Sequence, residues 1–311
     1  MAAIGFFGKR LIGVAVVVIS VSIFMFVLLR SIPGDPARLL AGFDAPPEVV
    51  EQIKERYGLN DPLPVQLIKY LENLFTLNLG TSVRTDSPVI VEILHRLPYT
   101  LYLSAAALFI AVAIGVPLGA YAALKKDSPI DYFVTALISV GTAMPTFWLG
   151  LMLILLFSVQ LKLLPAGGAG NPSSIILPAI TLSLPVMAPI AKTTRFTFLE
   201  VLKEDFVKLA VAKGLRRKTV IFKHVMKNAM VPVVTVLGLQ LGNLMKGAVI
   251  TETVFAWPGI GRLVVDSIFA RDYPMVQGAI FVLALIYALI NLAVDSLYAA
   301  IDPRIRLGGA S

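Results

Sequence analysis

The most informative stretch of the chain is KTTRFTFLEVLKEDFVKLAVAKGLRRKTVIFKHVMK, residues 192–227, an island of charge between two apolar runs. The runs on either side, residues 163–191 and 228–245, contain no Asp, Glu, Lys or Arg. The island holds ten Lys or Arg and three acids, so it carries +7 of the chain's net charge of +8. Because Lys and Arg accumulate in short inner loops of membrane proteins, residues 192–228 are predicted to form a cytoplasmic loop.

The pattern inside this basic loop predicts two short helices around a glycine. Leu202, Phe206 and Leu209 recur at helical spacing, which predicts an amphipathic helix up to about residue 213. Gly214 is suited to end that helix, and a second one can cover residues 219–228. A helix, glycine turn and helix lying along a membrane face can be bound by a partner protein.

Composition places the chain among integral membrane proteins. Of 311 residues, 57% are hydrophobic and 15% are charged, whereas soluble domains average roughly 25% charged residues. The chain has no cysteine, which excludes disulfides and cysteine-based metal sites. Its pI of about 9.6 could indicate nucleic-acid binding, but the positive charge lies beside apolar runs without interleaved aromatic residues. The lipid bilayer is therefore the predicted surrounding, and no nucleic acid is a predicted partner.

Hydropathy predicts an all-α membrane protein with six transmembrane helices and both termini in the cytoplasm. Residues 1–30 form the first helix, because the apolar run 11–29 can cross roughly 30 Å of hydrocarbon and has no obvious cleavage site. Residues 98–311 form a five-helix domain, and its spans are predicted at 98–124, 132–161, 175–191, 229–249 and 275–294. This orientation places 16 of the 27 Lys and Arg on the inner side, including those of the tail 302–306.

Residues 31–97 are predicted to be an extracytoplasmic helical segment. Residues 30–97 contain nine acids and seven Lys or Arg, so they lack the positive excess of an inner loop. Proline starts and apolar spacing predict short helices at 46–58, 64–75 and 88–96. The segment could be a cap that packs on the membrane rim, a docking surface for an external partner, or both.

Prolines and glycines indicate where spans should bend or break. Gly115, Pro117 and Gly119 predict a kink in the second span, and Pro145 lies in the middle of the third. Pro178, Pro185 and Pro189 predict a broken fourth span that faces a water-filled pathway, while Gly238, Gly242 and Gly247 interrupt the fifth. Residues 251–274 are predicted to be a re-entrant or rim segment.

No motif for bond-making chemistry is present. The sequence lacks a phosphate-binding G-x-x-x-x-G-K-[ST] loop, an H-E-x-x-H zinc motif and a G-x-S-x-G nucleophile motif. Its two histidines, His95 and His224, are predicted to lie on opposite sides of the membrane. The chain is therefore predicted to be no enzyme, with no catalytic residue, no metal site and no bound cofactor.

Polar and helix-breaking residues of the fourth and fifth spans and of the segment after them are candidates for lining or gating a pathway. Lys246 could meet an acidic group of a substrate or snorkel to the membrane rim. Glu252 and Asp295 are expected at span ends, in contact with the interface. The candidates are Pro185, Gln240, Asn243, Lys246, Glu252, Trp257, Pro258 and Gly259.

Several motifs together resemble one family. DFVKLAVAKGLRRKTVIFKHVMKNAMVP, residues 205–232, resembles the EAA loop of the permease subunits of ABC importers, with Gly214 as its glycine and Ala210 as an agreeing alanine. Lys208 and Leu209 stand where that loop usually has Glu and Ala. Other motifs resemble the dipeptide, oligopeptide and nickel branch: RSIPGDPA (30–37), YGLNDPLPVQ (57–66), NLGTS (78–82), GLQLG (238–242), ETVFAWPGIGRL (252–263), RDYPMVQG (271–278) and DPRIR (302–306).

The resemblance implies one half of a transmembrane pathway in the inner (plasma) membrane of a prokaryote, working by alternating access. It implies a second homologous permease, two ABC ATPase subunits that hold ATP and Mg²⁺, and an extracytoplasmic solute-binding protein. It also implies that the ATPase subunits grip the basic loop through Asp205, Phe206, Leu209, Ala210, Lys213, Gly214, Arg216 and Arg217. Permeases that resemble this chain carry peptides, nickel chelates, glutathione-like molecules or oligosaccharides. Lys246 stands where a small or apolar residue is expected in such permeases.

Two other classes remain open from the sequence. An ion-coupled secondary transporter would be expected to show acids inside its spans and an inverted repeat, and neither is evident. A membrane scaffold or channel subunit needs no energy source, but it explains the structured basic loop less well. Dependence of uptake on ATP separates these alternatives.

Overall fold

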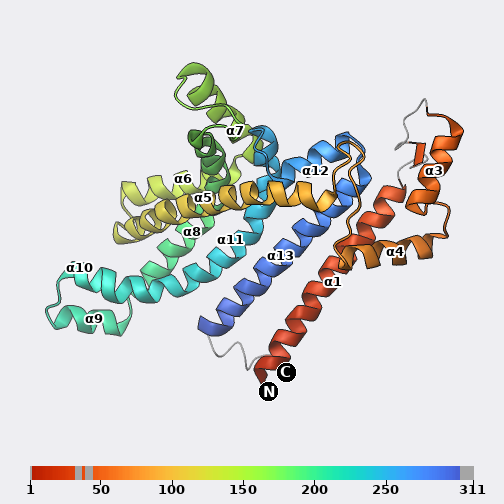
Figure 1. The fold of residues 1–311 in the computed structure, drawn as a ribbon. Coiled ribbons are helices and arrows are strands. Elements are labelled where there is room, and N and C mark those ends of the chain that lie inside the picture. Colours follow the sequence, from red (N-terminus) through yellow and green to blue (C-terminus); the bar gives the residue numbers. More distant parts are fainter. Residues whose placement is uncertain (1, 32–36, 39–44, 302–311) are drawn as a thin grey trace. The chain divides into compact units, whose positions relative to one another are not determined.

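A computed structural model describes residues 2–31, 37–38 and 45–301, and Figure 1 shows that these residues are mainly helical. No strand occurs in these ranges, which hold one isolated bridge between Thr81 and Pro88, so the all-α prediction is confirmed. The helices with long apolar runs are α1 (Ala2–Ser31), α5 (Val89–Leu124), α8 (Ile176–Val201), α11 (Met226–Val254) and α13 (Tyr273–Ile301). The others are α3 (Pro47–Tyr57), α4 (Leu63–Phe75), α6 (Pro129–Ala143), α7 (Thr146–Leu153), α9 (Asp205–Ala212), α10 (Arg217–Thr219), α12 (Ile260–Phe269), the π-helices Ile154–Gln160 and Val220–Val225, and the 3₁₀-helix Pro172–Ile175.

The described residues contain five helices that are long and apolar enough to cross a membrane. They correspond to the predicted first, second, fourth, fifth and sixth spans. The predicted third span, residues 132–161, is not straight, because α6 and the helix Thr146–Gln160 meet at a bend of 105° near Pro145. The number of spans is six if this bent pair crosses the membrane once. The predicted inner tail, residues 302–306, lies outside the described residues.

Several helices are longer than predicted. The helix predicted at 88–96 is the beginning of α5, which continues through Pro98 and Pro117. α8 continues ten residues beyond residue 191 with Pro185 and Pro189 inside it, and α11 runs unbroken through Gly238, Gly242 and Gly247. The predicted breaks in α8 and α11 were therefore wrong, and no helix end marks the predicted boundary at residue 97. The physical reason is that lipid offers no hydrogen-bond partner, so an apolar segment keeps its helix despite residues of low helix propensity.

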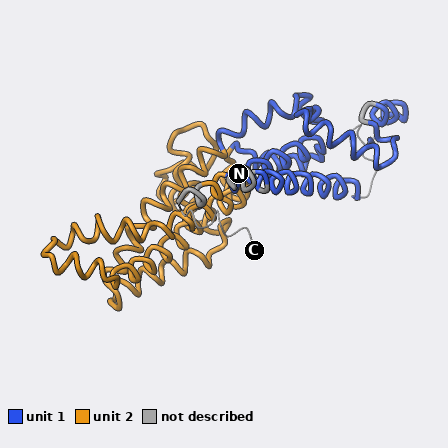
Figure 2. Tube along the Cα trace, turned by 90° about the horizontal axis from the view of Figure 1, so that it is seen from below, with its two compact units in different colours: residues 1–99, 258–292 blue, residues 100–257, 293–311 orange. Residues whose placement is uncertain are grey.

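The chain consists of two compact units, shown in different colours in Figure 2: unit 1 is residues 1–99 and 258–292, and unit 2 is residues 100–257 and 293–311. In unit 2, α11 packs mainly against α8, and α8 also contacts α6 and α7. Buried Leu103, Ala107, Leu182, Ile190 and Leu244 belong to the apolar core that joins α5, α8 and α11.

Two glycines allow α5 to approach α8 closely. A Cβ atom at Gly119 would lie 2.2 Å from the carbonyl oxygen of Ala191, and one at Gly115 would lie 3.1 Å from that of Met187. Glycines four residues apart form one face of a helix and permit close packing of membrane helices. The pair predicted to kink α5 therefore forms a packing surface.

An ion pair between a buried carboxylate and a partly exposed guanidinium joins α6 to α8. The guanidinium of Arg195 donates from Nε to Asp131 Oδ1 and from Nη2 to Asp131 Oδ2, both at 2.6 Å. Asp131 is 2% exposed and also accepts from the backbone N–H of Asp127, while Ser128 caps the beginning of α6. This bidentate geometry fixes the first turn of α6 against the second half of α8.

In unit 1, two motifs that are far apart in sequence meet. Ser82 of NLGTS donates from its hydroxyl to the carboxylate of Asp272 in RDYPMVQG. Asp272 is buried and also accepts from the backbone N–H of Met275, in the first turn of α13. Gly278 leaves room for Leu79 and Val89, because a Cβ at position 278 would lie 2.6 Å from Val89 Cγ1. The loop before α5 is thereby fixed to α13.

Gly119→Ala is expected to weaken the contact between α5 and α8 because its methyl group would overlap the Ala191 carbonyl oxygen. Overpacking of this kind costs about 1–3 kcal/mol, to be measured by unfolding the purified chain in mixed SDS micelles. Gly13→Ala in α1 is the control, because no heavy atom lies within 4 Å of its added Cβ. Equal stability of the two variants would show that the contact does not constrain the helices.

Asp131→Asn is expected to destabilise unit 2 by about 2–4 kcal/mol, because it leaves the Arg195 guanidinium without its charged partner. Asp131→Leu combined with Arg195→Leu should recover most of this loss, since no uncompensated charge remains. Asp205→Asn is the control; it removes an exposed pair with Lys208, and its cost should stay below about 1 kcal/mol. SDS unfolding of all four proteins tests this, and a double variant less stable than Asp131→Asn would contradict it.

Candidate functional site

The basic loop is built from the end of α8, helix α9 and the turn that follows it. Glu204 precedes α9 in an extended conformation, and Lys213 ends the helix. Gly214 has a φ of +76°, which only glycine adopts without strain, and nothing lies within 4 Å of the place of its Cβ. Gly214 is therefore required for the direction of the chain and not for close packing. The predicted helix and glycine turn are confirmed.

The inner face of α9 is anchored in the protein. Val207 and Ala210 are buried in a cluster with Phe198 of α8 and with Val220 and Val225 of the π-helix before α11. Ala120 and Ala123 of α5 belong to the same cluster. Since α9 contacts residues before and after the loop, it is held as part of the α8–α11 assembly.

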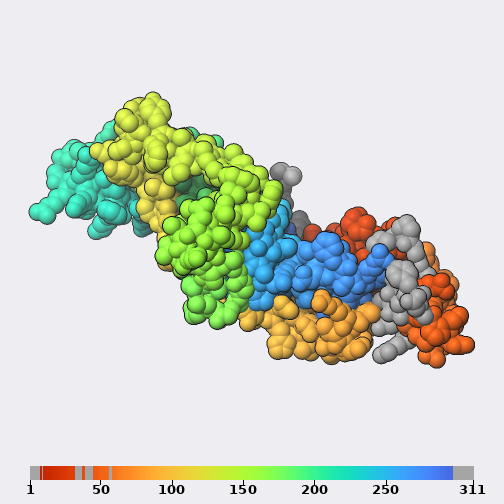
Figure 3. Space-filling view, turned by 90° about the horizontal axis from the view of Figure 1, so that it is seen from above, coloured from red at the N-terminus to blue at the C-terminus, as the bar shows by residue number. Residues whose placement is uncertain are grey.

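The outer face of α9 remains apolar and exposed. Phe206 is 40% exposed and Leu209 is 55% exposed. The predicted helical spacing is confirmed, and the smaller Val207 and Ala210 form the packed face. In Figure 1, α9 and α10 lie at one end of the α8–α11 pair, and Figure 3 shows this teal segment at the surface.

Basic side chains surround these apolar residues. Lys213, Arg216 and Arg217 are exposed, whereas Asp205 pairs locally with Lys208, at 2.8 Å from Nζ to Oδ1. We call the exposed set of Phe206, Leu209, Lys213, Arg216 and Arg217 the coupling surface. An apolar centre with a basic rim can bind a protein groove that has an apolar floor and acidic edges.

The second helix predicted in the loop, residues 219–228, is not a separate element. α10 passes into the π-helix Val220–Val225, which continues directly into α11. Val225 is buried, whereas Phe222 is 68% exposed. The loop thus returns to α11 without a second hinge.

Four pathway candidates lie on α11, and three of them, Gln240, Asn243 and Lys246, lie near its middle. Gln240 is buried and accepts at 3.2 Å from the side-chain amide of Asn243, which is exposed. Lys246 is exposed one turn further on, in a stripe with Leu239 and Ile250 at spacings of three and four residues. Polar groups on such a stripe of a membrane helix indicate contact with protein or water in preference to lipid. Pro185 is half-buried inside α8.

Glu252 is buried, which corrects the prediction of an interfacial position. Its side chain is 0% exposed, and its Oε1 accepts at 2.7 Å from the hydroxyl of Thr100 in α5. The backbone oxygen of Glu252 accepts from the N–H of Trp257, which is also buried. The structure therefore brings Glu252 and Trp257 together, while Pro258 and Gly259 belong to unit 1, where Gly259 precedes α12.

Sequence reasoning missed the pair Asp131–Arg195 and the bond Ser82–Asp272. The partners are 64 and 190 residues apart in sequence. The only signal in the sequence was that Asp131, Arg195 and Asp272 are charged residues near apolar runs. This signal does not show which residue each of them contacts. In the part of the chain that the structure describes, no group of three or more His, Asp or Glu side chains could hold a metal ion.

Comparison with protein families gives two matches that together cover most of the chain. Residues 115–307 match the family of binding-protein-dependent transport system inner membrane components. Residues 3–104 match the N-terminal part of binding-protein-dependent transport system membrane components. The boundary between the two matches lies within α5.

Curated relatives agree over almost their full length. The chain is 42% identical to the dipeptide transport system permease protein DppB of Alkalihalophilus pseudofirmus, covering 96% of this chain and 98% of the relative. It is 42% identical to the glutathione transport system permease protein GsiC of Pectobacterium atrosepticum, covering 97% and 99%. A solved inward-facing structure of the MetNI methionine ABC transporter shares the fold, with a TM-score of 0.60, 16% identity and coverage of 69% of this chain and 98% of that chain.

The motifs in the sequence, the family matches and the relatives agree. The resemblance found in the sequence is confirmed: this chain belongs to the family of binding-protein-dependent transport system inner membrane components.

Proposed function

We propose that this chain is one half of the transmembrane pathway of an ATP-driven importer for short peptides or peptide-like solutes. Family membership supports a transport role, and the names of the two relatives, a dipeptide and a glutathione permease, favour peptides over nickel chelates. The observation that carries the proposal is the coupling surface. Its apolar side chains stay exposed on a helix whose opposite face is fixed in the protein, and its basic side chains are exposed in the residues that follow this helix.

The proposed partners follow from this assignment. A second homologous permease completes the pathway, and two ABC ATPase subunits bind ATP and Mg²⁺, so this chain itself needs no cofactor. One ATPase subunit binds the coupling surface. An extracytoplasmic solute-binding protein docks partly on residues 31–97, and the complex lies in the plasma membrane of a prokaryote with both termini of this chain inside.

Energy transfer would pass through the anchored helix α9. Movement of the ATPase subunit displaces Phe206 and Leu209, and Val207 and Ala210 on the other face pass the displacement to α8 and α11. Transmission of this kind needs an element that moves as a rigid body between two packing arrangements. Because α11 carries Asn243 and Lys246 in its exposed stripe, its movement would change the lining of the pathway.

Phe206→Ala combined with Leu209→Ala is expected to uncouple the ATPase subunits. Both side chains are exposed, so the fold should persist, but an apolar anchor of an interface is worth about 2 kcal/mol or more. Co-purification of the ATPase subunits should fall at least about tenfold, and substrate-stimulated ATP hydrolysis should be lost. Phe269→Ala in α12 is the matched control, because Phe269 is 84% exposed and outside the loop. Normal stimulation in the double variant would exclude the coupling surface.

The proposed function is tested by uptake into proteoliposomes that contain this permease, its partner permease and both ATPase subunits. Labelled dipeptide delivered with the solute-binding protein should accumulate only when ATP is present at the ATPase face. Replacing ATP by a non-hydrolysable analogue should abolish accumulation. Because Glu252 is a buried carboxyl that could carry a coupling proton, a further arm of the experiment applies a proton gradient without ATP. Uptake in that arm would contradict the importer and support an ion-coupled transporter.

A further inference from the structure

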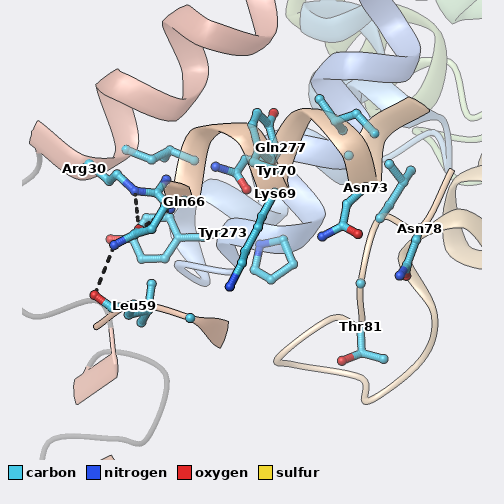
Figure 4. Close-up of a pocket in the computed structure, with 17 residues that line it drawn as sticks. Arg30, Leu59, Gln66, Lys69, Tyr70, Asn73, Asn78, Thr81, Tyr273 and Gln277 are labelled. Carbon is cyan, nitrogen blue, oxygen red and sulfur yellow. Dashed lines mark hydrogen bonds between the residues drawn. The ribbon is translucent and has the colours of Figure 1, made fainter. Parts of the chain in front are cut away.

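Unit 1 contains a cavity of about 480 Å³ that the transport mechanism does not use. The end of α1, helix α4, the loop before α5 and the beginning of α13 line it. Figure 4 shows Arg30 and Gln66 at one end, Asn78 and Thr81 at the other, and Lys69 between them. The cavity is thus polar along its length and contains two cations.

The cavity lies where two apolar helices end. Arg30 belongs to the last turn of the candidate span Arg10–Ser31, and Tyr273 is the first residue of the candidate span Tyr273–Ser296. Both side chains line the cavity, so both spans leave the hydrocarbon beside it. Arg, Lys and Tyr are favoured at this level of a membrane, where lipid headgroups lie. The cavity would lie at the level of the headgroups in either orientation of the chain across the membrane.

The first cation, Arg30, is held in place and retains hydrogen-bonding capacity. Its Nε and Nη2 donate to Gln66 Oε1 at 3.0 and 2.9 Å, and the guanidinium carbon lies 3.5 Å from the centre of the Phe26 ring. Gln66 is oriented by donating to the backbone oxygens of Leu59 and Asp61. Two of the five guanidinium N–H groups are used in these bonds, so the others can bind an anion.

The second cation, Lys69, gives the cavity a net positive charge. Its Nζ lies 2.7 Å from Asp61 Oδ2, and its side chain is 59% exposed. Among the described residues at the cavity, one acid beside two cations leaves one positive charge in excess. Tyr70, which also lines the cavity, stays neutral at physiological pH because burial raises the pKa of its phenol to about 12.

The rest of the lining can hydrogen-bond a neutral polar group. Asn73, Asn78 and Gln277 contribute amides, and Thr81 contributes a hydroxyl. Amides donate and accept, which matches the hydroxyl groups of a polyol. A ligand that fits both parts is an anion attached to a hydroxylated group.

Apolar side chains are exposed in the turns of α1 that precede the cavity-lining Arg30. Phe24, Val27 and Leu28 are between 44% and 63% exposed, in the two turns before Arg30. A soluble anion would leave these side chains uncovered, whereas acyl chains attached to the bound anion can lie along them. We propose that the cavity binds the headgroup of an anionic phospholipid, with the phosphate at Arg30 and Lys69 and the glycerol hydroxyls at the amides.

Native mass spectrometry of the full-length chain in mild detergent tests this, with phosphatidylglycerol and phosphatidylcholine titrated separately. Phosphatidylglycerol should be retained in preference to phosphatidylcholine. Lys69→Gln should lower its retention about fivefold, because one cation near an anionic headgroup contributes about that factor. Lys69→Arg should preserve retention. Lys162→Gln, which removes an exposed lysine of unit 2, is the control and should behave like the parent chain.

Competition separates the possible sources of the anion. Glycerol phosphate at millimolar concentration should displace little phosphatidylglycerol if the acyl chains contribute, and full displacement would overturn the lipid assignment in favour of a soluble anion. Displacement by a dipeptide would overturn it in favour of a peptide site. The proposal would also be overturned if the parent chain retained both lipids equally. It would be overturned as well if Lys69→Gln retained as much phosphatidylglycerol as the parent chain. The transport proposal is unaffected by any of these results.

Discussion

The absence of hydrogen-bond partners in hydrocarbon governs this structure, because every backbone group inside a span must find its partner within the protein. The helices therefore continue through Pro98, Pro117, Pro185 and Pro189. Where a helix does end among buried residues, specific bonds replace the helical ones. After α11, the N–H of Trp257 bonds to Glu252 and the carbonyl of Phe255 accepts from Gly168. Gly167 is needed there, since a Cβ would lie 2.0 Å from that carbonyl oxygen.

Once the helices are continuous, small residues and buried polar pairs decide how they pack. Helices in lipid gain little from burying apolar side chains against one another, so close contact and hydrogen bonds carry more of the association. Gly115 and Gly119 provide the close contact between α5 and α8. The ion pair Asp131–Arg195 and the bond from Thr100 to Glu252 add directed contacts within unit 2. α8 takes part in the first two of these contacts, which makes it the central helix of the unit.

The sequence predicted the class, the family, the charged loop and the glycine turn, because each depends on local composition or on a short motif. It failed where the outcome depends on the surroundings. Helical spacing predicted α9 but did not show that Val207 and Ala210 would form its packed face. The intrinsic preferences of Pro and Gly predicted breaks in α8 and α11 that the apolar medium overrides. Glu252 was expected at the interface because it lies at the end of its span; its bond with Thr100, 152 residues away in sequence, left no local signal.

Under the proposed function, the two faces of α9 would let a small helix transmit a large movement. Val207 and Ala210 hold the helix in a cluster with residues of α5, α8, the π-helix Val220–Val225 and α11, and neither has a long side chain that could change its conformation to absorb a displacement. Gly214 follows as a sharp turn, yet the π-helix after α10 is buried at Val220 and Val225, so the turn is fixed on both sides. A force applied at Phe206 and Leu209 would therefore move α8 and α11 together instead of bending the loop. Because Arg195 ties α8 to Asp131, α6 would have to follow the same movement or break this ion pair.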